Sequence, residues 1–196
     1  ASFYYDFIVD SIKPFLYEHV LQPEVRTVNG PATICAADTG TYTINAPNSK
    51  FCWQVSGGSI VSTTNGGQTV TVAWDTVGAG VLKYKELSPI LAEGVWYNHT
   101  VNVISRPNAF AGIDVSICKG ESTSLAATGG STYSWLPVSG LANPNAPFTE
   151  AQPDSSTQYV VTVSNGFCAE PDTVNITVSD PPPISITKSG DSLFTA

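Results

Sequence analysis

Methionine is absent from this 196-residue sequence, histidine occurs only twice, and charged residues make up only 12% of the chain. Two histidines give no support for a Ser-His-Asp arrangement, so catalysis of that kind is not expected. Sixteen acidic residues against eight basic ones, with no basic cluster in the sequence, argue against nucleic acids and anionic membranes as partners. No apolar run approaches the roughly 20 residues that a membrane-spanning helix needs.

The absence of methionine has a second consequence. The sequence does not start at an initiator residue, and Ala1 opens no signal-peptide pattern. At the other end, residues 184–196 begin a new alternating segment and then stop. We therefore expect the 196 residues to be part of a longer mature polypeptide.

Strand-forming residues and turn-forming residues are abundant, and together they favour an all-β protein. Apolar and polar residues alternate through four segments, as in half-buried strands. These segments are 41–44, 69–74, 81–84 and 100–103. Glycine-rich turn signals separate them, which predicts short antiparallel strands packed as a β-sandwich.

The sequence also repeats itself. Trp53 follows Cys35 by 18 residues, and Trp135 follows Cys118 by 17. Because an immunoglobulin-like sandwich packs a tryptophan of its third strand in the core, we expect Trp53 and Trp135 to be core residues. The fold class predicted is all-β, with tandem immunoglobulin-like (PKD-like) antiparallel β-sandwiches.

We expect four parts along the chain. They are the end of a preceding module with a junction (1–22), a PKD-like or immunoglobulin-like sandwich (23–105), an immunoglobulin-like sandwich (106–180), and a proline junction with the first strand of a following module (181–196). Proline runs hold an extended, semi-rigid geometry, so the modules are expected to form a stiff rod.

The four cysteines favour an oxidising compartment. A Cys118–Cys168 bridge would close a loop of about 50 residues and contribute roughly 4 kcal/mol. The first copy has no equivalent of Cys168, so the hypothesis there is a Cys35–Cys52 bridge, contributing roughly 3 kcal/mol. Metal binding is disfavoured because the sequence has no Cys-x-x-Cys pair.

The second copy resembles a known family. It combines AGIDVSICKGES (111–122), YSWLP (133–137), YVVTV (159–163) and GFC (166–168). This pattern is similar to the immunoglobulin-like repeats of very large surface and secreted proteins of the Bacteroidota, including gliding-motility adhesins and other products of the type IX secretion system. The first copy resembles the companion PKD-like domain, although it lacks the usual late cysteine. The resemblance covers about residues 25–196.

The resemblance implies an extracellular, cell-surface protein. Because the sequence shows no catalytic constellation, neither enzyme activity nor a cofactor is expected. Its expected function is that of a structural segment of a large secreted filament or adhesin, a stiff rod for attachment, motility or capture. Expected partners are identical chains in lateral contact, and a surface glycan or cell target. The alternatives are spacer domains of a secreted hydrolase, or a carbohydrate-binding module.

Two further sets of residues are candidates for binding or modification. Calcium ligands could come from four carboxylates, although no Asp-x-Asp-x-Asp run is present: Asp114, Glu170, Asp172 and Asp180. Four Asp-Ser/Thr-aliphatic steps resemble the O-glycosylation motif of Bacteroidota secreted proteins: Ser11, Thr76, Thr173 and Ser192. An equally good interpretation of these steps is a turn before a β-branched strand residue.

Aromatic residues gather at two places. The first cluster is Phe3, Tyr4, Tyr5 and Phe7, and the second is Trp96 with Tyr97. On a strand Trp96 and Tyr97 must face opposite ways, so one of them is expected to lie outside the sandwich. Both a core role and a lateral interface are compatible with these patterns.

Overall fold

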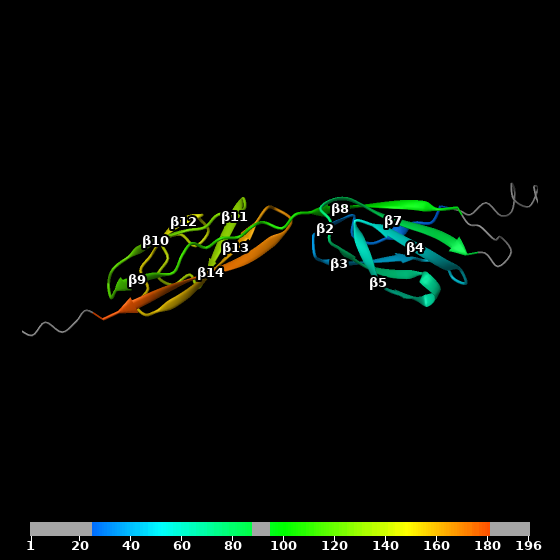
Figure 1. Cartoon of the computed structure of the whole chain (residues 1–196). Coiled ribbons are helices and arrows are strands. Elements are labelled where there is room, and N and C mark those ends of the chain that lie inside the picture. Colours follow the sequence, from blue (N-terminus) through cyan, green and yellow to red (C-terminus); the bar gives the residue numbers. More distant parts are fainter. Residues whose placement is uncertain (1–24, 88–94, 181–196) are drawn as a thin grey trace, which may run out of the picture. The chain divides into compact units, whose positions relative to one another are not determined.

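The computed structural model describes residues 25–87 and 95–180 and divides into two compact units, the first ending at Ser105 and the second beginning at Arg106 (Figure 1). The division into four modules stays a prediction, because residues 1–22 and 181–196 fall outside the described ranges. No described helix is both long enough and apolar enough to cross a membrane.

The first unit is a sandwich of two four-stranded sheets. One sheet has the order β1-β3-β6-β5 and the other the order β2-β8-β7-β4. The strands are β1 (Val28–Asn29), β2 (Thr33–Cys35), β3 (Thr39–Ile44), β4 (Lys50–Ser56), β5 (Gly58–Thr64), β6 (Thr69–Trp74), β7 (Gly78–Leu87) and β8 (Tyr97–Ile104), with a 3₁₀ turn η1 (Asn65–Gly67). The four alternating segments predicted as strands lie in β3, β6, β7 and β8, so that prediction is confirmed.

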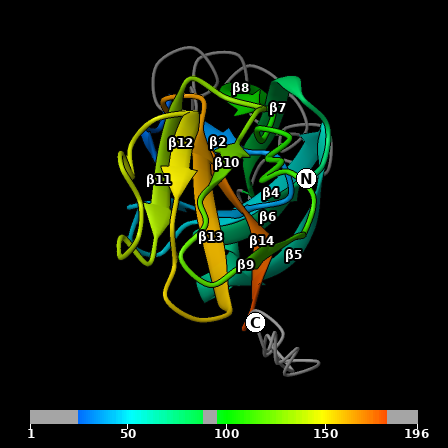
Figure 2. The ribbon, with the colours of Figure 1, turned by 90° about the vertical axis from the view of Figure 1, so that its left-hand side faces the viewer.

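The second unit has the same layered plan with fewer strands. Its larger sheet has the order β11-β13-β14-β9, and a two-stranded sheet pairs β10 with β12 (Figure 2). The strands are β9 (Val115–Cys118), β10 (Thr123–Ala126), β11 (Thr132–Leu136), β12 (Phe148–Ala151), β13 (Thr157–Ser164) and β14 (Ala169–Ser179). The chain therefore consists of tandem immunoglobulin-like β-sandwiches, as predicted.

Alternation along the strands builds a separate core in each unit. In β6 the buried residues are Val70, Val72 and Trp74, while the residues between them are half-buried. The indole Nε1 of Trp74 donates a hydrogen bond to the Tyr42 hydroxyl at 3.0 Å, so this buried polar pair is satisfied. Burial raises the pKa of the Tyr42 hydroxyl, which keeps it protonated.

Trp53 and Trp135 lie in the two cores. Trp53 is 9% exposed and donates from Nε1 to the carbonyl oxygen of Gly67 at 2.5 Å. Trp135 is fully buried, and its Nε1 donates to the Ala146 carbonyl at 3.0 Å. Both indoles thus pack in apolar surroundings while their N–H groups reach a backbone acceptor.

Each unit pairs an early strand in parallel with the end of its last strand. In the first unit β2 runs parallel to the end of β8, with Thr33 opposite Asn102 and Cys35 opposite Ile104. In the second unit β9 runs parallel to the end of β14, and Cys118 lies opposite Ser179. The other strand pairs in both units are antiparallel.

Candidate functional site

The cysteine pairing differs from both predicted bridges. Cys52 and Cys118 are free thiols, Cys118 being exposed and Cys52 half-buried. Cys35 and Cys168 are both disulfide-bonded. Neither the Cys35–Cys52 bridge nor the Cys118–Cys168 bridge forms.

Strand order explains this correction. Two strands, β8 and β7, separate β2 with Cys35 from β4 with Cys52, which puts the two residues about 14 Å apart at normal strand spacing. Cys118 lies opposite Ser179, the last residue of β14, whereas Cys168 directly precedes the first residue of that strand. The length of β14 therefore separates Cys168 from Cys118 by about 36 Å. A disulfide needs Cα atoms within about 7 Å, so neither pair can be bridged.

The candidate site is a face of the first unit that the sequence did not single out. Strand β7 buries Leu82 and Tyr84 in the core, and therefore turns Lys83 and Lys85 to the outer face of the sheet. Opposite them on β4 lie Gln54 and Cys52. We call these outward residues, with Trp96 beside them, the lysine face.

Trp96 belongs to this face through Lys85. The Lys85 ammonium nitrogen lies 5.0 Å from the centroid of the Trp96 ring, within the range of a cation–π contact. The next residue, Tyr97, packs on the core and stacks on Tyr84 with ring centroids 5.4 Å apart. Trp96 is half-buried, so whether it takes part in an interface stays a prediction. Phe3, Tyr4, Tyr5 and Phe7 lie outside the described residues.

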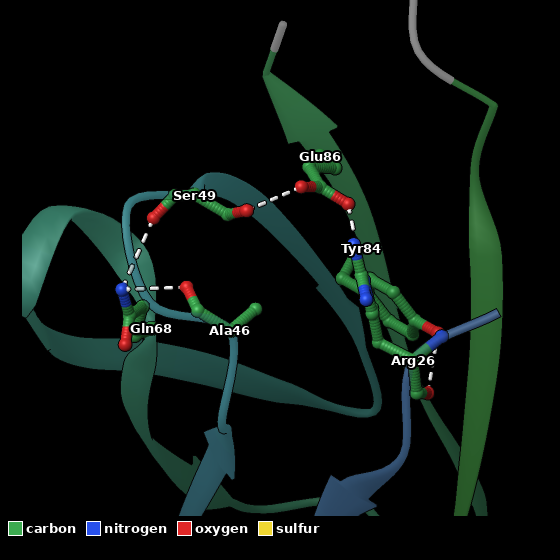
Figure 3. Close-up of polar contacts among 6 residues, drawn as sticks. All are labelled: Arg26, Ala46, Ser49, Gln68, Tyr84 and Glu86. Carbon is green, nitrogen blue, oxygen red and sulfur yellow. Dashed lines mark hydrogen bonds and ion pairs between the residues drawn. The ribbon is translucent and has the colours of Figure 1, made fainter. Parts of the chain in front are cut away.

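The carboxylate nearest to the lysines in sequence is engaged elsewhere. Glu86 accepts hydrogen bonds from the Ser49 hydroxyl and from Nε of Arg26, the latter at 3.3 Å (Figure 3). The backbone of Arg26 is fixed by the Tyr84 hydroxyl. The Arg26 N–H donates to this hydroxyl at 3.0 Å, and the hydroxyl donates to the Arg26 carbonyl oxygen at 2.7 Å. Among the described residues, no carboxylate lies within ion-pair distance of Lys83 or Lys85.

The same network fixes the loop at this end of the sandwich. The side-chain amide of Gln68 donates to the carbonyl oxygens of Ala46 and Ser49, at 3.0 and 3.2 Å (Figure 3). Ser49 thereby links this amide to Glu86. Burial is the largest cause that raises the pKa of the Tyr84 hydroxyl, so Tyr84 remains a hydrogen-bond donor at neutral pH.

The second unit presents an acidic surface instead. On its two-stranded sheet, Glu150 lies opposite Ser124, and alternation turns both side chains outward from buried Thr149 and Ala151. Glu150 accepts a hydrogen bond from the Ser122 hydroxyl. It also lines a shallow, open depression of about 330 Å³ together with Gly140, Leu141, Ala142 and Gln152. We call this the Glu150 depression.

The candidate calcium ligands all have other partners. Asp114 accepts from the backbone and side-chain nitrogens of Asn175, at 2.8 to 3.2 Å, and these bonds lower the pKa of its carboxyl. Asp172 accepts from the Ala111 backbone N–H at 2.8 Å, and Glu170 pairs with Arg106. Asp180 lies 3.8 Å from the Lys119 ammonium. Within residues 25–87 and 95–180, no three His, Cys, Asp or Glu side chains gather as metal ligands.

His99 is the histidine that the structure describes. Its ring meets Tyr42 edge-on at a centroid distance of 5.8 Å, and its buried Nε2 has no hydrogen-bond partner in this part of the chain. Burial lowers the pKa of the imidazole below its ordinary 6.5, so the neutral form is favoured. Of the candidate glycosylation residues, Thr76 and Thr173 are exposed, whereas Ser11 and Ser192 lie outside the described residues.

No protein-family model matches the chain, and no curated protein matches it significantly. Among solved structures, it is similar to a C-terminal 282-residue fragment of intimin, solved with the intimin-binding domain of the translocated intimin receptor. The identity is 16%, the match covers 77% of this chain and 63% of the fragment, and the TM-score is 0.50.

Two further solved structures are similar at lower TM-scores. The insect immune protein hemolin is 12% identical over 82% of this chain and 48% of its own, with a TM-score of 0.40. A titin I-band fragment, I67–I69, is 14% identical over 80% and 66%, with a TM-score of 0.38. The match spans less than two thirds of the intimin fragment and of hemolin. At these identities the similarity concerns the fold alone.

Proposed function

We propose that this chain is a structural segment of a large secreted cell-surface filament or adhesin, and that it acts as a stiff rod that transmits force. The repeat patterns over residues 25–196 support this proposal, since they resemble the modules of giant Bacteroidota surface proteins secreted by the type IX system. The tandem immunoglobulin-like fold agrees with such a role. The proposed location is extracellular.

The parallel pairing of β9 with the end of β14 carries the proposal. The two strands run in the same direction, so the chain enters β9 at one end of the paired region and leaves β14 at the other. Tension along the chain would slide one strand past the other. All hydrogen bonds of the pair are then strained together instead of breaking one after another.

The first unit has the same arrangement. Two backbone hydrogen bonds flank the β2–β8 pairing, from Asn102 N–H to the Ala32 carbonyl and from Ala36 N–H to the Ile104 carbonyl, both 2.9 Å. In the second unit the Lys119 N–H donates to the Ser179 carbonyl at 2.9 Å and closes the end of the pair. Both units are therefore built to resist extension through the strands that receive the force.

Single-molecule pulling tests this mechanism. Lys119→Pro removes the N–H that donates to Ser179, whereas Lys119→Ala removes the same side chain and keeps the N–H. We expect the proline variant to lower the unfolding force of the second unit and the alanine variant to leave it unchanged. Equal unfolding forces for the two variants would contradict a mechanical role for the β9–β14 pair.

The cellular role has its own test. In electron micrographs of the native surface material, an antibody against residues 25–180 is expected to label fibres. Label found only on a soluble secreted enzyme would favour a spacer role in a hydrolase.

A further inference from the structure

Within residues 25–87 and 95–180, charge is divided unequally between the two units. In the described part of the first unit four basic residues stand against three acidic ones, for a formal charge of +1: Arg26, Lys50, Lys83 and Lys85 against Asp38, Asp75 and Glu86. In residues 106–180 two basic residues stand against seven acidic ones, for a formal charge of −5: Arg106 and Lys119 against Asp114, Glu121, Glu150, Asp154, Glu170, Asp172 and Asp180. Two copies that each carry a net charge of −8 repel each other in most orientations, and least where oppositely charged surfaces meet.

The lysine face concentrates the positive charge of the first unit. Lys83 is exposed, and Lys85 is held by Trp96. Asp75 lies in the turn between β6 and β7, outside the strand that carries the lysines. Glu86 is engaged by Arg26 and Ser49. Among the described residues, the face is therefore a positive surface with an aromatic ring beside it.

The Glu150 depression has the complementary chemistry. Its polar wall carries the carboxylate of Glu150, and Leu141 and Ala142 supply apolar lining. Phe148, two residues before Glu150 on β12 and on the same outward side, is 69% exposed. A lysine can lay its aliphatic stem on such a lining while its ammonium group meets the carboxylate. An exposed phenyl ring next to it provides an apolar partner for Trp96.

We propose that the lysine face of one copy binds the Glu150 depression of a second copy. The two surfaces belong to different units, so the contact is heterologous and can repeat from copy to copy without closing. The inference rests on the proposed function, since a filament needs lateral contacts that propagate. A second copy is the occupant favoured here because both complementary surfaces are carried by the same chain.

Sedimentation velocity of the whole 196-residue chain tests the contact. Exposed charges interact over about 30 Å at roughly 10 mM salt and over about 3 Å at roughly 1 M. We expect concentration-dependent association at the low salt concentration and its loss at the high one. A chain that stays monomeric at both salt concentrations would refute the proposal.

Charge reversal identifies the surfaces. Lys83→Glu and Glu150→Lys are each expected to weaken association at low salt by roughly tenfold or more. The double variant K83E/E150K keeps the net charge of −8 and restores a complementary pair, so it is expected to regain association. Lys119→Glu and Asp154→Lys make the same changes in net charge at other exposed positions and serve as controls. Equal effects of the control and test variants, or no recovery in the double variant, would overturn the proposal.

Melting curves show whether every variant folds. If a charge-reversal variant does not fold, Lys83→Gln is a milder substitution at the same position. Polygalacturonate serves as an anionic polysaccharide probe. Lys83-dependent binding of this probe by a chain that does not self-associate would overturn the contact between copies and identify a polysaccharide as the occupant. Single-chain pulling does not depend on association, so the mechanical proposal stands or fails separately.

Discussion

The ammonium group of Lys85 lies 5.0 Å from the centroid of the Trp96 ring, whereas Lys83, on the same face of β7, is exposed. A cation–π contact near the surface contributes about 0.5–1 kcal/mol. We therefore expect Lys85→Ala to lower the free energy of unfolding of the first unit by about that amount, measured by urea denaturation. Lys83→Ala is the matched control and is expected to change it little. Equal losses for the two variants would mean that the ring does not hold Lys85.

The lysine face shows what sequence reasoning missed and why. The Lys-Tyr-Lys step of residues 83–85 was visible, and alternation on a strand predicts that both lysines share a face. The net charge of −8 gave no sign of this positive face, because a net charge does not show where the individual charges lie. That Glu86 is engaged by Arg26, 60 residues earlier, follows only from the folded chain.

The strands and the cysteines mark the limits of prediction from sequence. Strand positions and the buried tryptophans depend on local alternation, which the sequence displays directly. A disulfide depends on which strands are neighbours, and sheet order is not local information. Spacing suggested a short Cys35–Cys52 bridge, but β8, which comes from more than 40 residues later in the chain, inserts beside β2.

The state of the four thiols can be checked by alkylation of the native protein without reduction. We expect Cys118, which is exposed, to react first, and half-buried Cys52 to react more slowly. Cys35 and Cys168 should become labelled only after reduction. Peptide mapping that finds a Cys35–Cys52 or a Cys118–Cys168 link would contradict the structure.

Gly67 is expected to tolerate no side chain. Its φ is +85°, and a Cβ atom would lie 2.1 Å from the carbonyl oxygen of Phe51. Left-handed backbone costs a non-glycine residue roughly 1–2 kcal/mol, and overpacking typically adds 1–3 kcal/mol. Gly67→Ala should therefore destabilise the first unit by roughly 2–5 kcal/mol in urea denaturation.

The neighbouring glycine separates the two contributions. Gly66 has a φ of +65°, but a Cβ atom there would meet only the flexible Lys50 side chain, at 3.3 Å. Gly66→Ala is expected to show the backbone effect alone, about 1–2 kcal/mol. If both alanine variants lost the same stability, contact with Phe51 would contribute nothing.

The half-buried ring of His99 is expected to make the first unit sensitive to mild acid. Because burial lowers the pKa of the folded imidazole below 6.5, the unfolded chain takes up a proton more readily than the folded one. The stabilisation is thus complete above the unfolded pKa and is lost as the pH falls below it towards the folded pKa. We expect the free energy of unfolding of the first unit to decrease between about pH 7.5 and about pH 5.5.

His99→Phe isolates this effect, because phenylalanine keeps a ring against Tyr42 and does not titrate. The variant is expected to show a flat free energy of unfolding over the same pH interval. The lowered pKa of the Asp114 carboxyl does not interfere, since its unfolded value is 3.8 and it lies in the second unit. A variant that loses as much stability in mild acid as the unmodified chain would show that another group binds the proton, and would remove His99 as the cause.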